Sequence, residues 1–137
     1  MEEVKIIIRD DDYTKIQTPL NFAYNYVTKG IKVDILFLNI ALLVLTEKGS
    51  KSLRTNGRHS YRETWLKKQL AAEGTPTNVH YYLKKIKLAG RVNLYGCKDS
   101  ARLLKVAEED LIPEAEGLVD SSIFIENRSV AQYFLPA

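Results

Sequence analysis

Cysteine is almost absent from this chain of 137 residues, in which Cys97 is the only one. A single cysteine excludes an internal disulfide framework and is typical of a reducing compartment. No apolar run is long enough to span a bilayer, since the longest, residues 35–45, is short and contains Asn39. The chain begins Met-Glu-Glu and enters a strand-like segment at once, without the apolar core of a signal peptide. We therefore expect a cytoplasmic protein that does not enter a membrane.

Motifs for phosphate binding are also missing, because no G-x-G-x-x-G sequence and no P-loop follows any predicted strand. The net charge is only +3, but the two signs are segregated along the chain. Residues 48–68 hold seven Lys or Arg and one acid, whereas residues 106–127 hold seven acids and no base. Such asymmetry can attract an anionic ligand or match one subunit to another, and it is also compatible with two solvated faces.

What is present is typical of one globular domain over residues 1–137, with 45% apolar and 27% charged residues. Apolar, β-branched runs predict strands at 4–9, 32–38, 91–95 and 122–125, with a fifth near 117–119. Periodicity and capping residues predict helices at 18–30, 39–45, 61–74, 75–90, from 97 onward, and at 129–135. Strands that alternate with helices indicate an α/β protein of three α/β/α layers, with a mainly parallel sheet of four to five strands.

Two of these helices carry an apolar stripe that we expect in the core or in a subunit interface. The stripes consist of Tyr61, Trp65, Leu66 and Leu70, and of Val79, Tyr82, Leu83 and Ile86. His80 lies beside the second stripe, and we interpret it as a packing or surface residue rather than a base.

The most informative stretch is a short strand followed by Gly96, Cys97 and the start of a helix at Asp99 and Ser100. A cysteine at a helix N-terminus lies where the helix dipole favours the thiolate. The simpler interpretation is that a lone cysteine is a small buried apolar residue. Near the thiol, Lys98 adds positive charge.

Further residues are candidates for binding at the same edge of the sheet. Tyr95 and Ser100 flank the cysteine in sequence and could hydrogen-bond its sulfur. Asn39 ends the second strand, and the carboxyl ends of parallel strands meet at one edge, where ligands gather. Arg54 and Arg58 belong to a long basic loop that we assign to an anion or an acidic partner at this edge.

Asp10–Asp12 end the first strand at this edge. Three acids in a row could bind a metal ion, but no partner ligands at fixed spacing support such a site. We interpret them as a solvated loop and expect no metal.

Three blocks of the sequence resemble the DsrE/DsrF-like sulfur-relay proteins of the DsrEFH superfamily. The most specific block is Leu94-Tyr95-Gly96-Cys97 with the following Ser100, Leu103-Leu104 and Asp110-Leu111-Ile112-Pro113. The other two are Pro19-Leu20, Ala23 and Gly30 with the strand after them, and the apolar run from Ile40 to Leu45.

This resemblance implies a three-layer α/β fold and assembly into homotrimers or homohexamers. We expect no cofactor. It also implies a sulfurtransferase in which Cys97 carries sulfane sulfur as a persulfide or thiosulfonate. The acceptor would be a TusA-type sulfur-carrier protein or another thiol, because the chain holds no second thiol of its own.

Two alternatives treat Cys97 as structural. One is a nucleic-acid module that uses the basic residues between 48 and 87, against which the modest net charge and the lack of a known motif argue. The other is a small-molecule binder, as many doubly wound folds are, although no phosphate-binding motif supports it.

Overall fold

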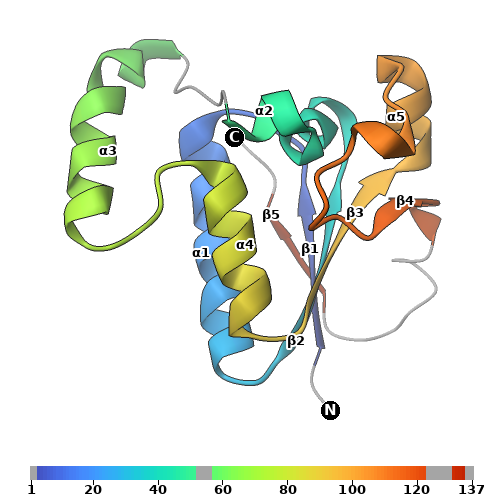
Figure 1. Ribbon diagram of the computed structural model, residues 1–137, viewed down its shortest axis with the longest axis horizontal. Coiled ribbons are helices and arrows are strands. Elements are labelled where there is room, and N and C mark those ends of the chain that lie inside the picture. Colours follow the sequence, from blue (N-terminus) through green and yellow to red (C-terminus); the bar gives the residue numbers. More distant parts are fainter. Residues whose placement is uncertain (1–2, 52–56, 123–130, 135–137) are drawn as a thin grey trace.

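The computed structural model describes residues 3–51, 57–122 and 131–134 of the chain. Strands and helices alternate along most of its length (Figure 1). The elements are β1 (Glu3–Ile8), α1 (Tyr13–Thr28), β2 (Lys32–Phe37), the 3₁₀ helix η1 (Asn39–Leu45), α2 (Glu47–Lys51), the 3₁₀ helix η2 (Gly57–Arg62), α3 (Glu63–Ala72), α4 (Val79–Ala89), β3 (Val92–Cys97), α5 (Lys98–Leu104), the 3₁₀ helix η3 (Glu108–Asp110), β4 (Gly117–Val119) and β5 (Ala131–Phe134).

The described strands form one sheet in the order β4-β3-β2-β1-β5, and every neighbouring pair is parallel. Parallel neighbours cannot be joined by a tight turn and need a crossover, which the intervening helices supply. The predicted α/β fold, a parallel sheet flanked by helices, is confirmed. The fifth strand expected near 117–119 is β4, at one edge of the sheet.

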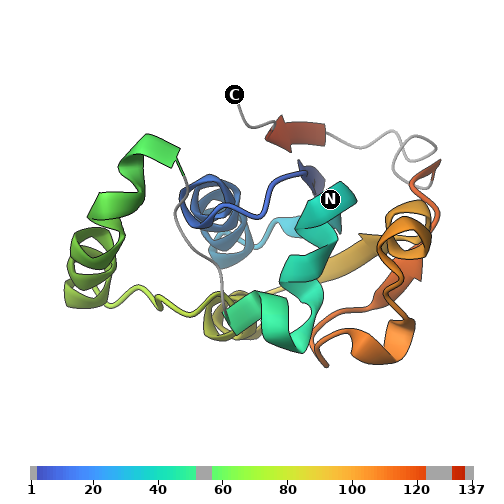
Figure 2. The same ribbon diagram turned by 90° about the horizontal axis from the view of Figure 1, so that it is seen from above.

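Alternation along the strands divides the sheet into two faces. Ile6, Ile35 and Leu94 are fully buried on the face that forms the main hydrophobic core. Figure 2 shows α1 and α4 side by side over this face, and the two helices contact each other. The opposite face carries Leu36 and Cys97, which form a separate small apolar cluster. Cys97 therefore lies on the side of the sheet turned away from α1 and α4.

The first helix begins earlier than the sequence pattern predicts. We expected Thr18 as its N-cap, but α1 starts at Tyr13 and is capped by Asp12, whose carboxylate accepts the backbone N–H of Thr14 at 3.0 Å. Pro19 then lies buried inside the helix, where it removes the hydrogen bond to the carbonyl of Lys15 and crowds that carbonyl. A full cap at Asp12 and the burial of Ile16 outweigh that loss.

The apolar run after β2 is helical, as expected, but it is a 3₁₀ helix that ends at Leu45. Asn39 opens it with a positive φ of 53°, a conformation that asparagine tolerates better than most residues. Gly49, which follows the run, does not end a helix but lies inside the short helix α2.

The two helices with apolar stripes differ in how far they are buried. On α4 the predicted stripe is confirmed, since Val79, Tyr82, Leu83 and Ile86 are all buried. The stripe beginning with Tyr61 is confirmed only for Leu66 and Leu70, which pack against the core. Its first two residues are wrong as core residues, since Tyr61 is 72% and Trp65 61% exposed. The reason is that α3 lies at one end of the molecule, away from the sheet (Figure 1).

The C-terminal prediction is also corrected. We expected a helix over 129–135, but Ala131–Phe134 form β5, parallel to β1, with Lys5 opposite Ala131. Pairing with the edge of β1 satisfies backbone groups that a helix would leave open on the sheet. The strand expected at 122–125 lies outside the described residues, apart from Ser122.

Candidate functional site

Cys97 is the last residue of β3 and the N-cap of α5, as the sequence pattern predicts. Its backbone is extended (φ −80°, ψ 129°), and the helix begins at Lys98. The neighbouring Gly96 is needed for packing rather than for a sharp turn. A Cβ atom there would approach Leu42 Cδ1 to 2.4 Å and Leu118 Cδ2 to 2.9 Å. The glycine thus lets η1 and β4 pack closely against the strand that carries the cysteine.

The side chain of Cys97 lies in an apolar enclosure and is only 5% exposed. Leu36 is buried with it, and four partly buried side chains pack around the pair: Ile7, Leu38, Tyr95 and Val119. Lys98, in contrast, is exposed, and its charge acts on Asp120. The backbone N–H of Ser122, with a smaller contribution from Lys98, lowers the pKa of Asp120.

Two predicted site residues, Asn39 and Ser100, are brought together. The backbone N–H of Asn39 donates to Ser100 Oγ at 2.7 Å, and Ser100 is 4% exposed. This bond ties the residue that follows β2 to the helix that follows Cys97. Its geometry explains why a serine belongs at this position: the hydroxyl holds Asn39 at the positive φ with which η1 begins.

The aspartates at the end of β1 share this edge, as expected for parallel strands. Asp12 does not lie in a solvated loop, however, because it is buried as the cap of α1. Its own backbone N–H donates to Asp10 at 2.7 Å, and Asp10 pairs with Lys15 at 3.6 Å. Over the described ranges, no three His, Cys, Asp or Glu side chains are arranged so that they could hold a metal ion.

The face of the sheet that carries Cys97 also holds a charged network that sequence reasoning missed. Lys5 Nζ lies 3.2 Å from Asp34 Oδ2, and both side chains are buried. Asn93 Nδ2 donates to the other oxygen of Asp34 at 2.9 Å. Burial alone would raise the pKa of Asp34, but the hydrogen bonds from Asn93 and Lys5 and the charge of Lys32 lower it. The sequence does contain a signal for this network, because the charged residues Lys5 and Asp34 lie within otherwise apolar strands.

Tyr95, a predicted binding residue, lies between this network and Cys97. Burial raises the pKa of Tyr95, and the negative charges of Asp34, Glu116 and Glu3 raise it further. Its hydroxyl therefore stays protonated at neutral pH.

The buried histidine has the packing role that we expected. His80 is 5% exposed at the start of α4, and its Nε2 lies 2.6 Å from Glu114 Oε1. Its Nδ1 is buried without a hydrogen-bond partner in the described part of the chain. This pair attaches the acidic segment after η3 to α4, together with Lys87, which donates to the carbonyl of Glu114 at 2.9 Å.

The basic loop contributes little that can be placed at this edge. Arg54 lies outside the described residues, and of Arg58 only the backbone, in η2, is described. Lys51 forms an ion pair with Glu47 within α2. Anion binding by Arg54 and Arg58 remains a prediction.

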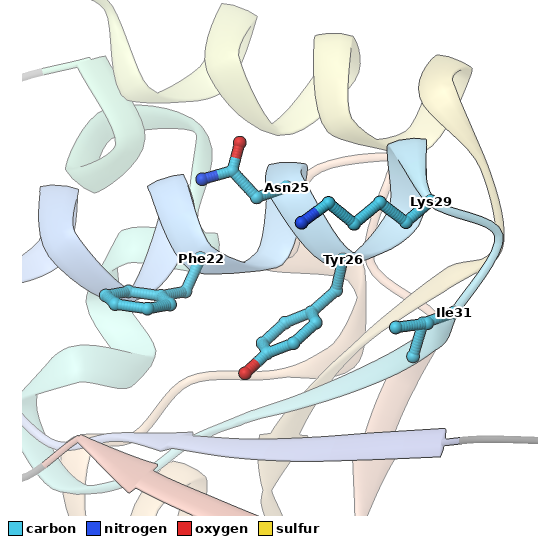
Figure 3. A pocket seen from close by; sticks show the side chains of 5 residues that line it. All are labelled: Phe22, Asn25, Tyr26, Lys29 and Ile31. Carbon is cyan, nitrogen blue, oxygen red and sulfur yellow. The ribbon is translucent and has the colours of Figure 1, made fainter.

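Two hollows lie away from Cys97. One, of about 310 Å³, is lined by Phe22, Asn25, Tyr26, Lys29 and Ile31. Figure 3 shows these side chains on the second half of α1 and in the turn that leads from it to β2, near the amino ends of the strands. The other, of about 320 Å³, is lined by Tyr61, Arg62 and Trp65.

These features define an α/β protein with a parallel sheet and a cysteine at its carboxyl edge. A solved structure of the protein of unknown function MTH1491 from Methanobacterium thermoautotrophicum is similar, with a TM-score of 0.59. The two share 13% sequence identity, over 97% of this chain and 99% of that chain, which shows the fold alone. No protein-family model and no curated protein matches the chain. None of the described helices is long and apolar enough to cross a membrane.

Proposed function

We propose that this protein is a cytoplasmic sulfur carrier of the DsrE/DsrF-like kind, which holds sulfane sulfur on Cys97 and passes it to an acceptor thiol. The observation that carries the proposal is the position of Cys97, the chain's single thiol, as the N-cap of α5 at the carboxyl edge of a parallel sheet. Ligands of such sheets gather at this edge, so a sulfur donor would approach the thiol there. The resemblance of the surrounding sequence to the sulfur-relay proteins supports the same function.

The chemistry is a pair of displacements without net oxidation or reduction. In loading, the Cys97 thiolate attacks a sulfane sulfur of a polysulfide, the sulfur–sulfur bond of the donor breaks, and the shortened polysulfide leaves with the electron pair. In discharge, an acceptor thiolate attacks the outer sulfur of the Cys97 persulfide and regenerates the Cys97 thiolate. Because no second cysteine exists in the chain, the acceptor is another molecule, such as a TusA-type carrier protein.

The apolar enclosure suits this role in one respect. Leu36, Leu38 and Val119 limit the access of water and bulky oxidants to the sulfur, while a small linear polysulfide needs little room. Tyr95, which packs against the same cluster as Cys97, is our candidate to donate a hydrogen bond to a persulfide anion. We further propose that the protein acts as a homo-oligomer.

The test is intact-mass spectrometry after incubation of the native protein with polysulfide at neutral pH. We expect one added sulfur, removed by dithiothreitol, and no addition to the Cys97→Ser variant. Tyr95→Phe is the matched variant that keeps the ring, and it should load more slowly. The same incubation of the protein unfolded in urea shows whether the polysulfide can modify an accessible thiol. A native protein that stays unmodified while the unfolded protein is modified would mean that Cys97 is a structural residue.

A further inference from the structure

The outer side of α3, together with the end of η2, exposes two large aromatic rings. Tyr61 is 72% and Trp65 61% exposed, although both have the spacing of core residues. The two rings and Arg62 line the hollow of about 320 Å³, a volume at the lower end of the range for ligand sites. Two aromatic rings that share a hollow offer a flat partner for another planar ring.

Positive charge accompanies the two rings. The guanidinium of Arg62 lies 5.3 Å from the centre of the Tyr61 ring, and its Nε donates to the Tyr61 hydroxyl at 2.9 Å. Lys68 is exposed one turn beyond Trp65. We refer to Tyr61, Arg62, Trp65 and Lys68 as the aromatic-basic face.

Negative charge is turned away from this face. Residues 48–68 contain a single acid, Glu63. Glu63 is 8% exposed, lies two residues from Trp65 and so on another side of the helix, and pairs with Lys67 at 3.5 Å. The next acid, Glu73, is the C-cap of α3, roughly two turns beyond Trp65. The rings therefore lie among bases, which suits an anionic ligand.

The aliphatic side of α3 is already used within the chain. Leu66 and Leu70 pack against the core, and Lys67 lies over the ring of Tyr13 at 4.8 Å. A helix that binds a membrane surface presents its aliphatic side outward, which α3 cannot do while it keeps these contacts. What it offers outward is two rings and two cations.

We propose that the aromatic-basic face binds single-stranded nucleic acid, with bases stacked on Tyr61 and Trp65 and phosphates beside Arg62 and Lys68. Proteins that bind single strands without sequence preference combine aromatic rings for stacking with positive charge along the backbone. Such binding needs no recognition motif, so the lack of one in the sequence does not count against it. The net charge of +3 predicts weak binding that falls as the salt concentration rises.

This function is independent of the proposed sulfur chemistry. Cys97 lies at the end of a strand, whereas α3 lies at one end of the molecule, away from the sheet (Figure 1). The Cys97→Ser variant should therefore bind nucleic acid as the wild type does, and failure of either proposal leaves the other standing.

Trp65 is the only tryptophan of the chain, so tryptophan fluorescence reports on this face alone. The experiment titrates the native full chain at low salt with an oligothymidylate of about eight nucleotides. We expect saturable quenching, because stacked bases contact the indole ring. An abasic oligomer of the same length supplies the phosphates without the bases and should bind about tenfold more weakly. Absence of quenching, or equal affinity for the two oligomers, would overturn the proposal.

Substitutions separate the stacking from the charge. Tyr61→Ala should weaken binding of the oligothymidylate about tenfold, as should Trp65→Ala when binding is followed by the anisotropy of a labelled oligomer. Arg62→Gln and Lys68→Gln should each reduce the slope of log affinity against log salt concentration by about 0.7. All four side chains are exposed, so circular dichroism should stay that of the wild type. A wild-type slope in both charge variants would overturn the proposal.

Tyr81→Ala is the matched control variant. Tyr81 is 60% exposed and has Lys84 at 5.4 Å from its ring centre, but it belongs to α4 and shares no hollow with a second ring. This variant should bind the oligothymidylate with wild-type affinity. If it weakens binding as much as Tyr61→Ala does, the binding is not confined to the aromatic-basic face and the assignment is wrong.

Three other occupants of the face predict different results, and each result would overturn the proposal. Thymidine monophosphate that quenches as well as the oligomer, at equal nucleotide concentration, would indicate a site for a free nucleotide. Quenching by vesicles of anionic phospholipid but not by the oligomer would indicate a membrane surface. A lower mass of Trp65→Ala than of the wild type in multi-angle light scattering would indicate a contact between subunits.

Discussion

Removal of the Ser100 hydroxyl should loosen the carboxyl edge of the sheet without changing the fold. In Ser100→Ala the backbone N–H of Asn39 loses its acceptor at 2.7 Å, in a place where Ser100 is 4% exposed. An unsatisfied backbone group of this kind costs about 1–3 kcal/mol, while alanine in a helix recovers about 0.5 kcal/mol of propensity. We expect a net loss of about 1 kcal/mol in the free energy of unfolding.

Urea unfolding followed by circular dichroism measures this loss. With an m-value of about 2 kcal/mol/M, the urea midpoint should fall by about 0.5 M. The measurement is repeated at several protein concentrations, because only subunit dissociation makes the midpoint depend on concentration. Ser60→Ala, at an exposed serine, is the control and should stay within about 0.5 kcal/mol of the wild type.

The thiol gives a second measurement on the same variant. Because the bond joins the start of η1 to α5, its loss should make Cys97 easier to reach. A change of about 1 kcal/mol in local opening corresponds to labelling of Cys97 by iodoacetamide that is about fivefold faster. An unchanged midpoint would refute the assigned hydrogen bond. A lower midpoint with unchanged labelling would refute the link between this bond and access to the thiol.

Three further predictions concern the sheet and its edge. Asp34→Asn should lower stability by about 3 kcal/mol at neutral pH, because it leaves the buried charge of Lys5 with a weaker partner. Since the pKa of Asp34 is lowered in the folded state, the contribution of Asp34 to the free energy of unfolding is complete above about pH 4 and is lost as the pH falls further. Urea unfolding at several pH values from about 6 to about 2 should show this loss in the wild type and a smaller loss in the variant. Gly96→Ala should cost about 1–3 kcal/mol in urea unfolding, because its Cβ would collide with Leu42, and wild-type stability would show that the leucine moves away freely. Asn39→Gly should keep the free energy of unfolding within about 0.5 kcal/mol of the wild type, because glycine adopts a positive φ freely, while Asn39→Ala should lower it by about 1 kcal/mol. Equal free energies of unfolding for the two variants would contradict the positive φ of Asn39.

Local pattern was enough to predict the elements that are buried on one side and capped by their own sequence. The stripe on α4 repeats every three to four residues, and Asn78 caps the helix by accepting the N–H groups of His80 and Tyr81. The strand before Cys97 alternates, with Val92 and Leu94 buried. Such signals survive because burial and capping act within one turn or one strand, and the alternation of strands with helices then restricts the sheet to a parallel one.

The tertiary structure decided the features that depend on distant partners. Trp65 has the spacing of a core residue, but α3 lies beyond the end of the sheet and turns Trp65 outward. Residues 131–134 carry a helical pattern, yet the open edge of β1 supplies backbone partners that make them a strand. The bond between Asn39 and Ser100 spans 61 residues, and no local pattern contains it. It forms because parallel pairing places the ends of β2 and β3 side by side, which only the folded sheet can do.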